Sequence, residues 1–323
     1  MKAIVYHEYG PPDVLALQDI EKPIAKSGEV RVRVCAASAN PYDWHFMRGE
    51  PYIVRLQGGL RKPKNTVLGS DIAGEVDAVG ENVTRYRPGD EVIAEVGSGG
   101  FAEYTCVTED HLGLKPANLT FEQAAAVPMA GFTALQGLRD HGGTGPGHRV
   151  LIIGASGGVG TFAVQIAKSL GAEVTGVCST RNVDMVRSLG ADQVVDYTQE
   201  DFTRSGQRYD LIFQLAGTLS ASVCRRVLAS DGTLVLSSGE SSGRWIGPLG
   251  RVARAVAVSA FSSQKMVPLF TKRSSEDMQF LKELIEAGEV TPVIDRTYSL
   301  SEAPEAIRYL EEGHARGKVV ITV

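Results

Sequence analysis

The stretch that decides the fold runs from Leu151 to Gly160 and reads Leu-Ile-Ile-Gly-Ala-Ser-Gly-Gly-Val-Gly. Its apolar start suits a strand buried on both faces, and Thr161 to Leu170 then place apolar side chains on one helical stripe that ends before Gly171. The glycines between the two let a pyrophosphate approach the backbone N–H groups at the start of the helix. The stretch therefore predicts a strand, a loop and a helix that together bind a dinucleotide.

The loop matches the dinucleotide pattern Gly-x-Gly-x-x-Gly only in part. Ala155 replaces the first glycine, while Gly157 and Gly160 keep the second and the third. Such a loop alone is equally compatible with a tight strand-to-helix turn that binds no ligand. If it binds a cofactor, the residues we expect to hold it are Ala155, Ser156, Gly157, Gly158 and Val159.

The residues after the next strand bear on which cofactor is bound. The strand Glu173 to Cys178 is followed by Ser179, Thr180 and Arg181, where an NAD-binding protein carries an acidic residue for the ribose hydroxyls. Two hydroxyls and a guanidinium bind a 2′-phosphate, whereas a carboxylate repels it. We therefore predict NADPH as the cofactor; the alternative is that Arg181 is only an exposed charge at the start of the helix Asn182 to Leu189.

The composition is that of an ordinary globular protein. With 323 residues the chain is long enough for two domains, and 43% of its residues are apolar and 22% charged. The net charge of −5 argues against general binding to nucleic acid or to an anionic membrane. No run of residues reads as a signal peptide or as a transmembrane helix, and even Val252 to Phe261 is interrupted by Arg254.

The four cysteines are scattered along the chain and form no close pair. Neither a disulfide framework nor a zinc knuckle is indicated by this spacing, and we expect a reducing, cytoplasmic compartment. The cysteines are Cys35, Cys106, Cys178 and Cys224.

The first third of the chain alternates in the manner of short strands. Strands are predicted over Glu29 to Ala37, with three valines on one face, over Ile72 to Val79 and over Glu91 to Val96. Between them, Asn40 to Leu68 reads as a long irregular segment that is rich in aromatic residues and contains a basic run at Arg61 to Lys64. We interpret this segment as the wall of a substrate cleft, with the basic residues as a solvated rim.

The middle of the chain changes to helices and then to alternating strands and helices. Thr120 is expected to cap a short helix that ends at Pro128, and Met129 to His141 reads as a second helix. Strands then alternate with helices, which predicts a parallel, doubly wound sheet with the glycine loop at its first crossover. The predicted strands are Val150 to Ile153, Glu173 to Cys178, Gln193 to Tyr197, Asp210 to Leu215 and Thr233 to Ser237.

Local signals add detail to this second half. Thr198 to Asp201 resembles a capping box, and Asp231-Gly232 predicts a turn before the last of these strands. Lys265 to Phe270 reads as a further strand, which Pro268 restricts to a sheet edge or a bulge. The end of the chain reads as helices from Ser275 to Gly288 and from Ala303 to Glu312, and as strands from Thr291 to Tyr298 and from Lys318 to Val323.

Together these stretches resemble the medium-chain dehydrogenase/reductase superfamily, in its zinc-free branch of quinone oxidoreductases and NADPH-dependent enone reductases. The resemblance implies an α/β protein with a GroES-like β-rich catalytic domain at residues 1–119, completed by residues 275–323, and a doubly wound parallel Rossmann domain at residues 120–274. The motifs that carry it are Asn40-Pro41-x-Asp43, Leu68 to Gly74, Arg87 to Val92, Gly154 to Gly160, Leu189 to Asp192 and Gly317 to Val320.

The resemblance also bears on metal binding. Zinc-dependent relatives carry a cysteine ligand where this chain has Asn40, and a His-Glu pair where it has Ser70-Asp71. Asn and Ser are poor zinc ligands, and the structural zinc lobe of four cysteines is missing as well. His45 lies nearby in the sequence, but a lone histidine beside an aromatic residue is more often a packed residue than a ligand, so we expect no metal.

Without a metal, the chemistry implied is hydride transfer from NADPH to a quinone or to the β-carbon of an α,β-unsaturated carbonyl. The catalytic candidates are Asn40, Asp43 and Tyr52, with the Tyr42 hydroxyl as a further donor. We take the Asn40 amide as the first choice to stabilise the developing oxyanion, although an asparagine that begins a turn before Pro41 is an equally good interpretation. Asp43 is expected to position the loop or the cofactor, since an ordinary aspartate is ionised at neutral pH.

The resemblance further implies that three residues outside the glycine loop reach the cofactor. They are Thr133, Tyr197 and Lys318, each of which is also compatible with a purely structural role. An alternative function is a non-catalytic NADPH-binding sensor or structural protein, and another is an NADP-dependent alcohol dehydrogenase. The expected partners are a small electrophilic carbonyl or quinone and, through the edge strand at Lys265 to Phe270, a second copy in a homodimer.

The cofactor assignment is testable at the end of the strand Glu173 to Cys178. Replacement of Arg181 by Ala, or of Ser179 by Asp, is expected to raise the KM for NADPH much more than the KM for NADH, because only NADPH carries the 2′-phosphate. Steady-state kinetics with both cofactors measure this difference. Equal effects on the two cofactors contradict the assignment.

Overall fold

The computed structural model describes residues 1–217, 219–237, 250 and 263–323, and the chain divides into two compact units. The first unit comprises Met1–Met129, Arg273–Gly288 and Pro292–Val323, and the second comprises Ala130–Lys272 and Glu289–Thr291. The division after Met129 lies further along the chain than the boundary at residue 119 that the sequence suggested.

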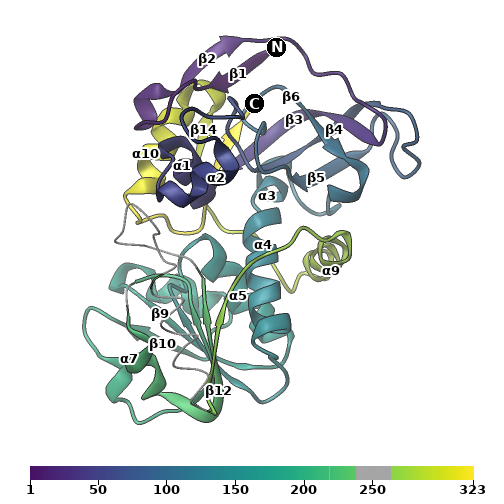
Figure 1. Ribbon diagram of the computed structural model, residues 1–323. Helices are drawn as coiled ribbons and strands as arrows, with labels where there is room; N and C mark the ends of the chain where they lie inside the picture. The colour runs from purple at the N-terminus through teal and green to yellow at the C-terminus, as the bar shows by residue number, and fades with distance from the viewer. Residues whose placement is uncertain (218, 238–249, 251–262) are drawn as a thin grey trace. The chain divides into compact units, whose positions relative to one another are not determined.

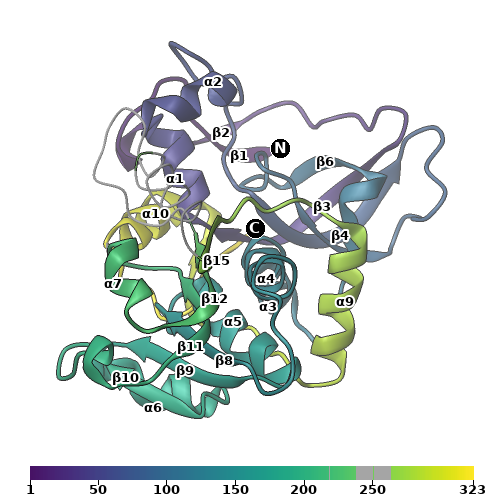
Figure 2. The ribbon, with the colours of Figure 1, turned by 60° about the horizontal axis from the view of Figure 1, so that its bottom comes forward.

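The second unit is built on a six-stranded parallel sheet. Its strand order is β10-β9-β8-β11-β12-β13, which is the order of a doubly wound Rossmann sheet (Figure 2). Every neighbouring pair is parallel, as the alternation of strands and helices predicted. The strands are β8 (Arg149–Ile153), β9 (Glu173–Cys178), β10 (Gln193–Asp196), β11 (Tyr209–Gln214), β12 (Leu228–Leu236) and β13 (Lys265–Pro268).

The glycine loop joins β8 to the helix α5, as expected, but the helix begins earlier than the apolar stripe suggested. α5 spans Gly158–Ser169, with Gly157 as its N-cap, and Phe162 and Ile166 on its buried face are fully inaccessible to solvent. Gly160 is needed for packing, because a Cβ atom there would lie 2.1 Å from the carbonyl oxygen of Gly154. The described part of this unit also contains α6 (Val183–Ser188) and α7 (Ala221–Arg225), with short 3-10 turns at Thr180–Asn182 and Phe202–Arg204.

The helical segment before the Rossmann sheet is confirmed. Thr120 caps α3 (Phe121–Ala125), where its side-chain oxygen accepts a hydrogen bond from the Gln123 backbone N–H. α4 (Pro128–Leu135) follows and continues directly into a π-helical segment, Gln136–His141.

Two predicted local signals in the second unit are wrong. Thr198 does not begin a capping box, because its backbone N–H and hydroxyl both donate to Asp196, and Asp201 instead caps the short 3-10 turn after it. Asp231-Gly232 is not a turn before a strand but lies inside β12, at a bulge where the register with β11 shifts. Lys265 to Phe270 does supply an edge strand, β13, whereas Val252 to Phe261 lies outside the described residues.

The first unit is built on a seven-stranded sheet with an added two-stranded one. The order of the larger sheet is β14-β15-β3-β4-β5-β7, and β6 pairs with β3. The C-terminal strand β15 lies antiparallel against β3, so residues far apart in sequence become neighbours. Figure 1 likewise shows the yellow C-terminal helix α10 (Ala303–Glu311) beside the dark blue α1 (Pro41–Arg48). The strands are β1 (Lys2–Val5), β2 (Ala16–Asp19), β3 (Glu29–Ala39), β4 (Asp71–Val79), β5 (Glu91–Glu95), β6 (Tyr104–Thr108), β7 (Leu112–Leu114), β14 (Ile294–Ser299) and β15 (Lys318–Thr322).

Alternation along β3 places its apolar residues in the core of this unit. Val30, Val32 and Val34 are all buried, as their spacing predicted, and they pack in one hydrophobic cluster with residues of β4, β5 and β15. α9 (Ser275–Glu286) and α10 (Ala303–Glu311) complete the unit, and the buried face of α10 carries Ala306 and Ile307.

The segment Asn40 to Leu68 is only partly irregular: its first part is mostly helical, contrary to the prediction, whereas residues 59–68 contain no helix or strand. α1 (Pro41–Arg48) begins at Asn40, where the Asp43 side chain accepts a hydrogen bond from the Asn40 backbone N–H, and it ends at Gly49 in the left-handed conformation. The pair Asn40-Pro41 therefore starts a helix instead of a turn. A short 3-10 turn, Tyr52–Val54, and α2 (Arg55–Gly58) follow.

No helix among the described residues is long and apolar enough to span a membrane.

The two glycines of the α5 loop provide a matched test of the packing. Gly160→Ala is expected to lower the free energy of unfolding by about 1–3 kcal/mol, because the added methyl group overlaps the backbone. Gly157→Ala places its Cβ 3.6 Å from the nearest atom and is expected to cost less than about 1 kcal/mol. Urea denaturation measures both, and equal losses would show that the loop does not pack as described.

Candidate active site

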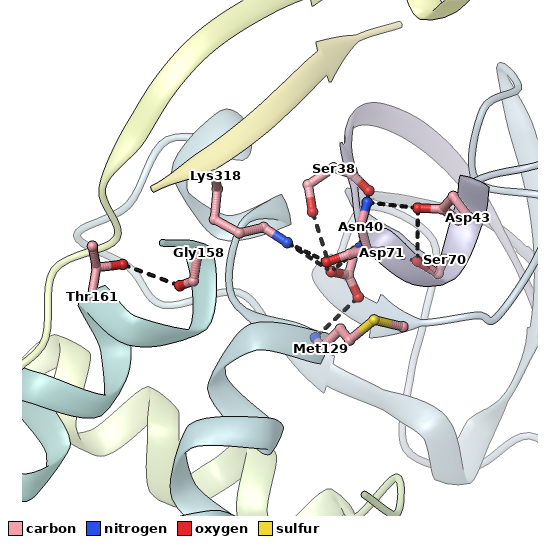
Figure 3. A network of polar contacts seen from close by, with 9 residues as sticks. All are labelled: Ser38, Asn40, Asp43, Ser70, Asp71, Met129, Gly158, Thr161 and Lys318. Carbon is pink, nitrogen blue, oxygen red and sulfur yellow. Dashed lines mark hydrogen bonds and ion pairs between the residues drawn. The ribbon is translucent and has the colours of Figure 1, made fainter. Parts of the chain in front are cut away.

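A network of buried polar side chains lies at one end of three neighbouring strands of the first unit. Lys318 begins β15, Ser38 lies near the end of β3, and Asp71 begins β4. The strand register brings them together, since Val319 pairs with Ala39 and Ser38 pairs with Asp71. Figure 3 shows these side chains converging on Asp71.

Asp71 receives hydrogen bonds on both carboxylate oxygens. Its Oδ2 accepts from the Ser38 hydroxyl at 3.1 Å and from Asn40 Nδ2 at 2.9 Å, and its Oδ1 accepts from the Met129 backbone N–H at 3.1 Å. The Lys318 ammonium lies 3.5 Å from Oδ2. Burial raises the pKa of Asp71 above its usual value, and the Lys318 ammonium and these donors oppose that rise.

Asn40 is the hub of the network. Its Nδ2 points to the Ser38 carbonyl oxygen, the Ser70 hydroxyl and Asp71, and its Oδ1 accepts from Lys318 Nζ at 2.5 Å. An amide has two N–H hydrogens, and both are directed at these internal acceptors. In this structure Asn40 therefore organises the site, and its amide is not free to donate to a substrate oxygen.

Asp43 differs from Asp71 in having one oxygen without a partner. Its Oδ2 accepts from the Asn40 backbone N–H at 2.8 Å and from the Ser70 hydroxyl at 3.2 Å, whereas its buried Oδ1 has no hydrogen-bond partner. Burial, together with the negative charge of Asp71, raises the pKa of Asp43 to about 7. This raised pKa argues against the assumption that Asp43 is an ordinary ionised aspartate.

A cavity of about 260 Å³ adjoins this network within the first unit. Asp43 and Tyr42 of α1 line it together with Tyr6, and Arg273 lines it as well. Burial raises the pKa of both tyrosine hydroxyls, so these remain protonated donors at neutral pH. The other predicted tyrosine, Tyr52, is not among the lining residues.

Tyr52 belongs to a separate cluster. The Arg55 guanidinium lies over its ring at 4.7 Å and over the ring of Tyr9 at 4.5 Å. The Tyr9 hydroxyl donates to the Gly59 carbonyl oxygen, and Arg55 donates to Gly49. The structure therefore gives Tyr52 a place in a cation–π cluster that holds this segment.

The network does not suit a zinc ion. The positions of the expected ligands carry Asn40, Ser70 and Asp71, and the Lys318 ammonium already lies among them. A divalent cation beside a buried ammonium is disfavoured by charge repulsion, and amide and hydroxyl groups are weak zinc ligands. His45 is the nearest histidine in the sequence, and its Nδ1 forms a hydrogen bond of 2.7 Å with the Glu50 carbonyl oxygen.

The predicted cofactor residues of the second unit gather at the carboxyl ends of its strands. Gly157 is the N-cap of α5 and has no side chain to cap it, so no side-chain cap bonds to the N–H groups of the first turn. Ser179 follows β9, and the exposed Tyr197 follows β10, with its backbone N–H bonded to Cys178. This is the edge at which doubly wound sheets bind their ligands.

Asn182, which was not predicted as a site residue, links the two halves of this edge. Its Nδ2 donates to Ser156 Oγ at 3.0 Å and to Ser179 Oγ at 3.2 Å, and its buried Oδ1 has no partner. Thr180 hydrogen-bonds to Asp196 instead. This bond has the largest effect on the pKa of Asp196, and together with a hydrogen bond from Thr198 it holds that pKa below its usual range.

The remaining two candidates lie in different surroundings. Thr133 is buried in α4 and belongs to the second unit. Lys318 is only 3% exposed and belongs to the first unit, where its ammonium is bound by Asn40 and Asp71. Ser38, Ser70 and Asp71 were not predicted as site residues, because only the strand register brings them together.

Comparisons with known proteins agree with this architecture. Residues 26–117 match the model of the alcohol dehydrogenase GroES-like domain, and residues 189–321 match that of a zinc-binding dehydrogenase. The chain is 34% identical to a chloroplast envelope quinone oxidoreductase homolog of Arabidopsis thaliana, over 99% of this chain and 98% of the relative. It is 36% identical to an NADPH-dependent alkenal/one oxidoreductase of the same plant, over 99% of this chain and 79% of the relative.

Solved structures show the same similarity. The quinone oxidoreductase of Coxiella burnetii has a TM-score of 0.87 and 32% identity, covering 100% of this chain and 99% of the other. The quinone oxidoreductase of Escherichia coli complexed with NADPH has a TM-score of 0.85 and 26% identity, and each chain is covered completely.

The buried ion pair predicts a large effect on stability. Lys318→Met is expected to lower the free energy of unfolding by about 3–5 kcal/mol, because the charge of Asp71 then remains buried without its cation. Lys282→Met is a matched control, since this lysine pairs with Glu286 on the surface of α9 and is expected to cost less than about 1 kcal/mol. Urea denaturation distinguishes the two, and equal stability of both variants contradicts a buried charged pair.

Proposed function

Because the chain belongs to the medium-chain dehydrogenase/reductase superfamily, in its quinone oxidoreductase branch, we propose that it is an NADPH-dependent oxidoreductase. Its acceptor is a quinone or the activated double bond of an α,β-unsaturated carbonyl, and it needs no metal ion.

The observation that carries the proposal is the ammonium of Lys318 within the network of Asn40 and Asp71. This network holds the positive charge that a metal would otherwise bring, but it keeps that charge bound to internal partners. Oxidation of an ordinary alcohol lacks a Lewis acid here to stabilise the alkoxide. Reduction of a quinone or an enone is easier, because the negative charge develops on an oxygen that hydrogen-bond donors can stabilise.

The second unit supplies the residues that fit NADPH. The N–H groups after Gly157 suit a pyrophosphate, and Ser179 with Arg181 suits a 2′-phosphate. Asn182 fixes the hydroxyls of Ser156 and Ser179 relative to each other. When bound, the nicotinamide ring of this cofactor supplies a hydride.

The first unit supplies a cavity for the acceptor. Its volume of about 260 Å³ suits a small ring or a short alkenal, and its wall includes both aromatic surface and hydroxyl groups. The phenols of Tyr6 and Tyr42 stay protonated because burial raises their pKa, so they can donate hydrogen bonds to a carbonyl oxygen.

The test is turnover with a panel of acceptors. We expect purified protein to oxidise NADPH steadily with quinones and 2-alkenals, and dialysis against a chelator to leave the rate unchanged. The loss of NADPH absorbance measures the rate before and after dialysis, and mass spectrometry identifies the reduced product. A rate that chelation abolishes and Zn²⁺ restores contradicts the metal-free reaction.

Two further outcomes distinguish the alternatives. Tight NADPH binding without turnover on any acceptor favours a sensor or a structural protein. Oxidation of simple alcohols with NADP⁺, in the absence of quinone or enone reduction, favours an alcohol dehydrogenase.

A further inference from the structure

The charged groups around the cavity do not balance. Two carboxylates near the cavity have a cation: Asp71 lies 3.5 Å from Lys318, and Glu95 lies 3.3 Å from Arg273. The strand register makes these pairs neighbours, since Asp71 of β4 pairs with Glu95 of β5. Asp43 is the third carboxyl group, and no ion pair within 4.0 Å joins it to a cation in the described part of the chain.

Asp43 is also fully enclosed. It is 1% exposed, and its Oδ2 is saturated by the Asn40 N–H and the Ser70 hydroxyl. Its Oδ1 has neither a donor nor an acceptor as partner, although buried polar atoms nearly always have one. A proton on Oδ1 makes the carboxyl neutral, and such a proton lacks an internal acceptor.

The cavity offers the place where that acceptor binds. Asp43 lines it beside Tyr6, Tyr42 and Arg273. The two phenols have pKa values raised by burial, and an arginine keeps its proton at any ordinary pH. Burial raises the pKa of Asp43 to about 7, so of these four lining groups it is the one that can give up a proton near neutrality.

We propose that Asp43 is the catalytic acid of the reduction, which delivers a proton from Oδ1 to an acceptor bound in this cavity. The proposal rests on the proposed function. A hydride adds to the β-carbon of an enone, and the O–H bond of Asp43 breaks as a C–H bond forms at the α-carbon. With a quinone, the hydride and this proton together give the hydroquinone. Transfer proceeds directly, and the bound acceptor must itself reach Oδ1, because this atom is buried away from water in the structure.

The network explains how Asp43 can alternate between its two forms. After proton transfer, the carboxylate keeps the Asn40 N–H and the Ser70 hydroxyl as donors and feels the positive charge of Lys318. Its burial and the nearby charge of Asp71 favour the return of a proton from water. Lys318 and Asp71 therefore act as positioning residues that set the charge around the acid.

The test is the variant Asp43→Asn, whose amide oxygen can still accept both hydrogen bonds but whose side chain cannot donate an acidic proton. We expect kcat with a quinone or a 2-alkenal to fall by about 100-fold or more. In the wild-type protein, kcat is expected to decline about tenfold for each pH unit above about 7, as Asp43 ionises, and this decline is expected to vanish in the variant. NADPH affinity, measured by fluorescence, is expected to stay unchanged.

Two further variants separate catalysis from folding. Asp277→Asn removes the charge of another buried aspartate in the first turn of a helix, α9, and is expected to keep the wild-type rate and pH profile. Asp43→Ala is expected to regain part of its activity when small carboxylic acids such as formic acid are added, because they supply the missing proton in the space left by the side chain.

The outcomes also distinguish this proposal from the proposed function. A wild-type protein that reduces no acceptor with NADPH overturns both. If the wild-type protein is active, two results overturn only the role of Asp43. One is an Asp43→Asn variant that keeps its rate. The other is an Asp43→Asn variant that loses rate but keeps the pH decline, together with an Asp43→Ala variant that small acids do not rescue.

Discussion

The rest of the site depends on a single buried ion pair, between Lys318 at the start of β15 and Asp71 at the start of β4. Taking two charges out of water is costly unless each is fully hydrogen-bonded, and here Asn40 bonds to both partners. This requirement fixes the Asn40 side chain, and with it the first turn of α1. Asp43 is held at the cavity because Asn40 is held at the ion pair.

The order of the chain follows from the same constraint. The lysine comes from the last strand, which follows the whole second unit in the sequence and returns to pair with β3. A zinc ion can be bound by residues close together in one segment, whereas this arrangement needs both ends of the chain. The internal cation explains why positions 40 and 70 carry an asparagine and a serine. These side chains hydrogen-bond to an ammonium group and to carboxylates, and they bind no metal.

Much of the fold could be predicted from local patterns, since buried parallel strands and the glycine loop are encoded in short stretches such as Val150 to Ile153. α1 was missed although its signals were present: Pro41 at the first position and Asp43 at the third are features of a helix start. The polar network could not be predicted from local sequence patterns, because Lys318 and Asp71 become neighbours only through the strand register. The elevated pKa of Asp43 arises from burial, which no local pattern reports.

The central claim is that the site holds one carboxyl group more than its cations can balance, so that Asp43 keeps its proton up to about pH 7. The most direct measurement is a titration of the aspartate carboxyl carbons by ¹³C NMR, with Asp43→Asn used to assign the resonance. We expect the Asp43 resonance to titrate near pH 7, because burial raises the pKa of Asp43 to about 7. An Asp43 resonance that shows full ionisation at pH 5 would contradict it.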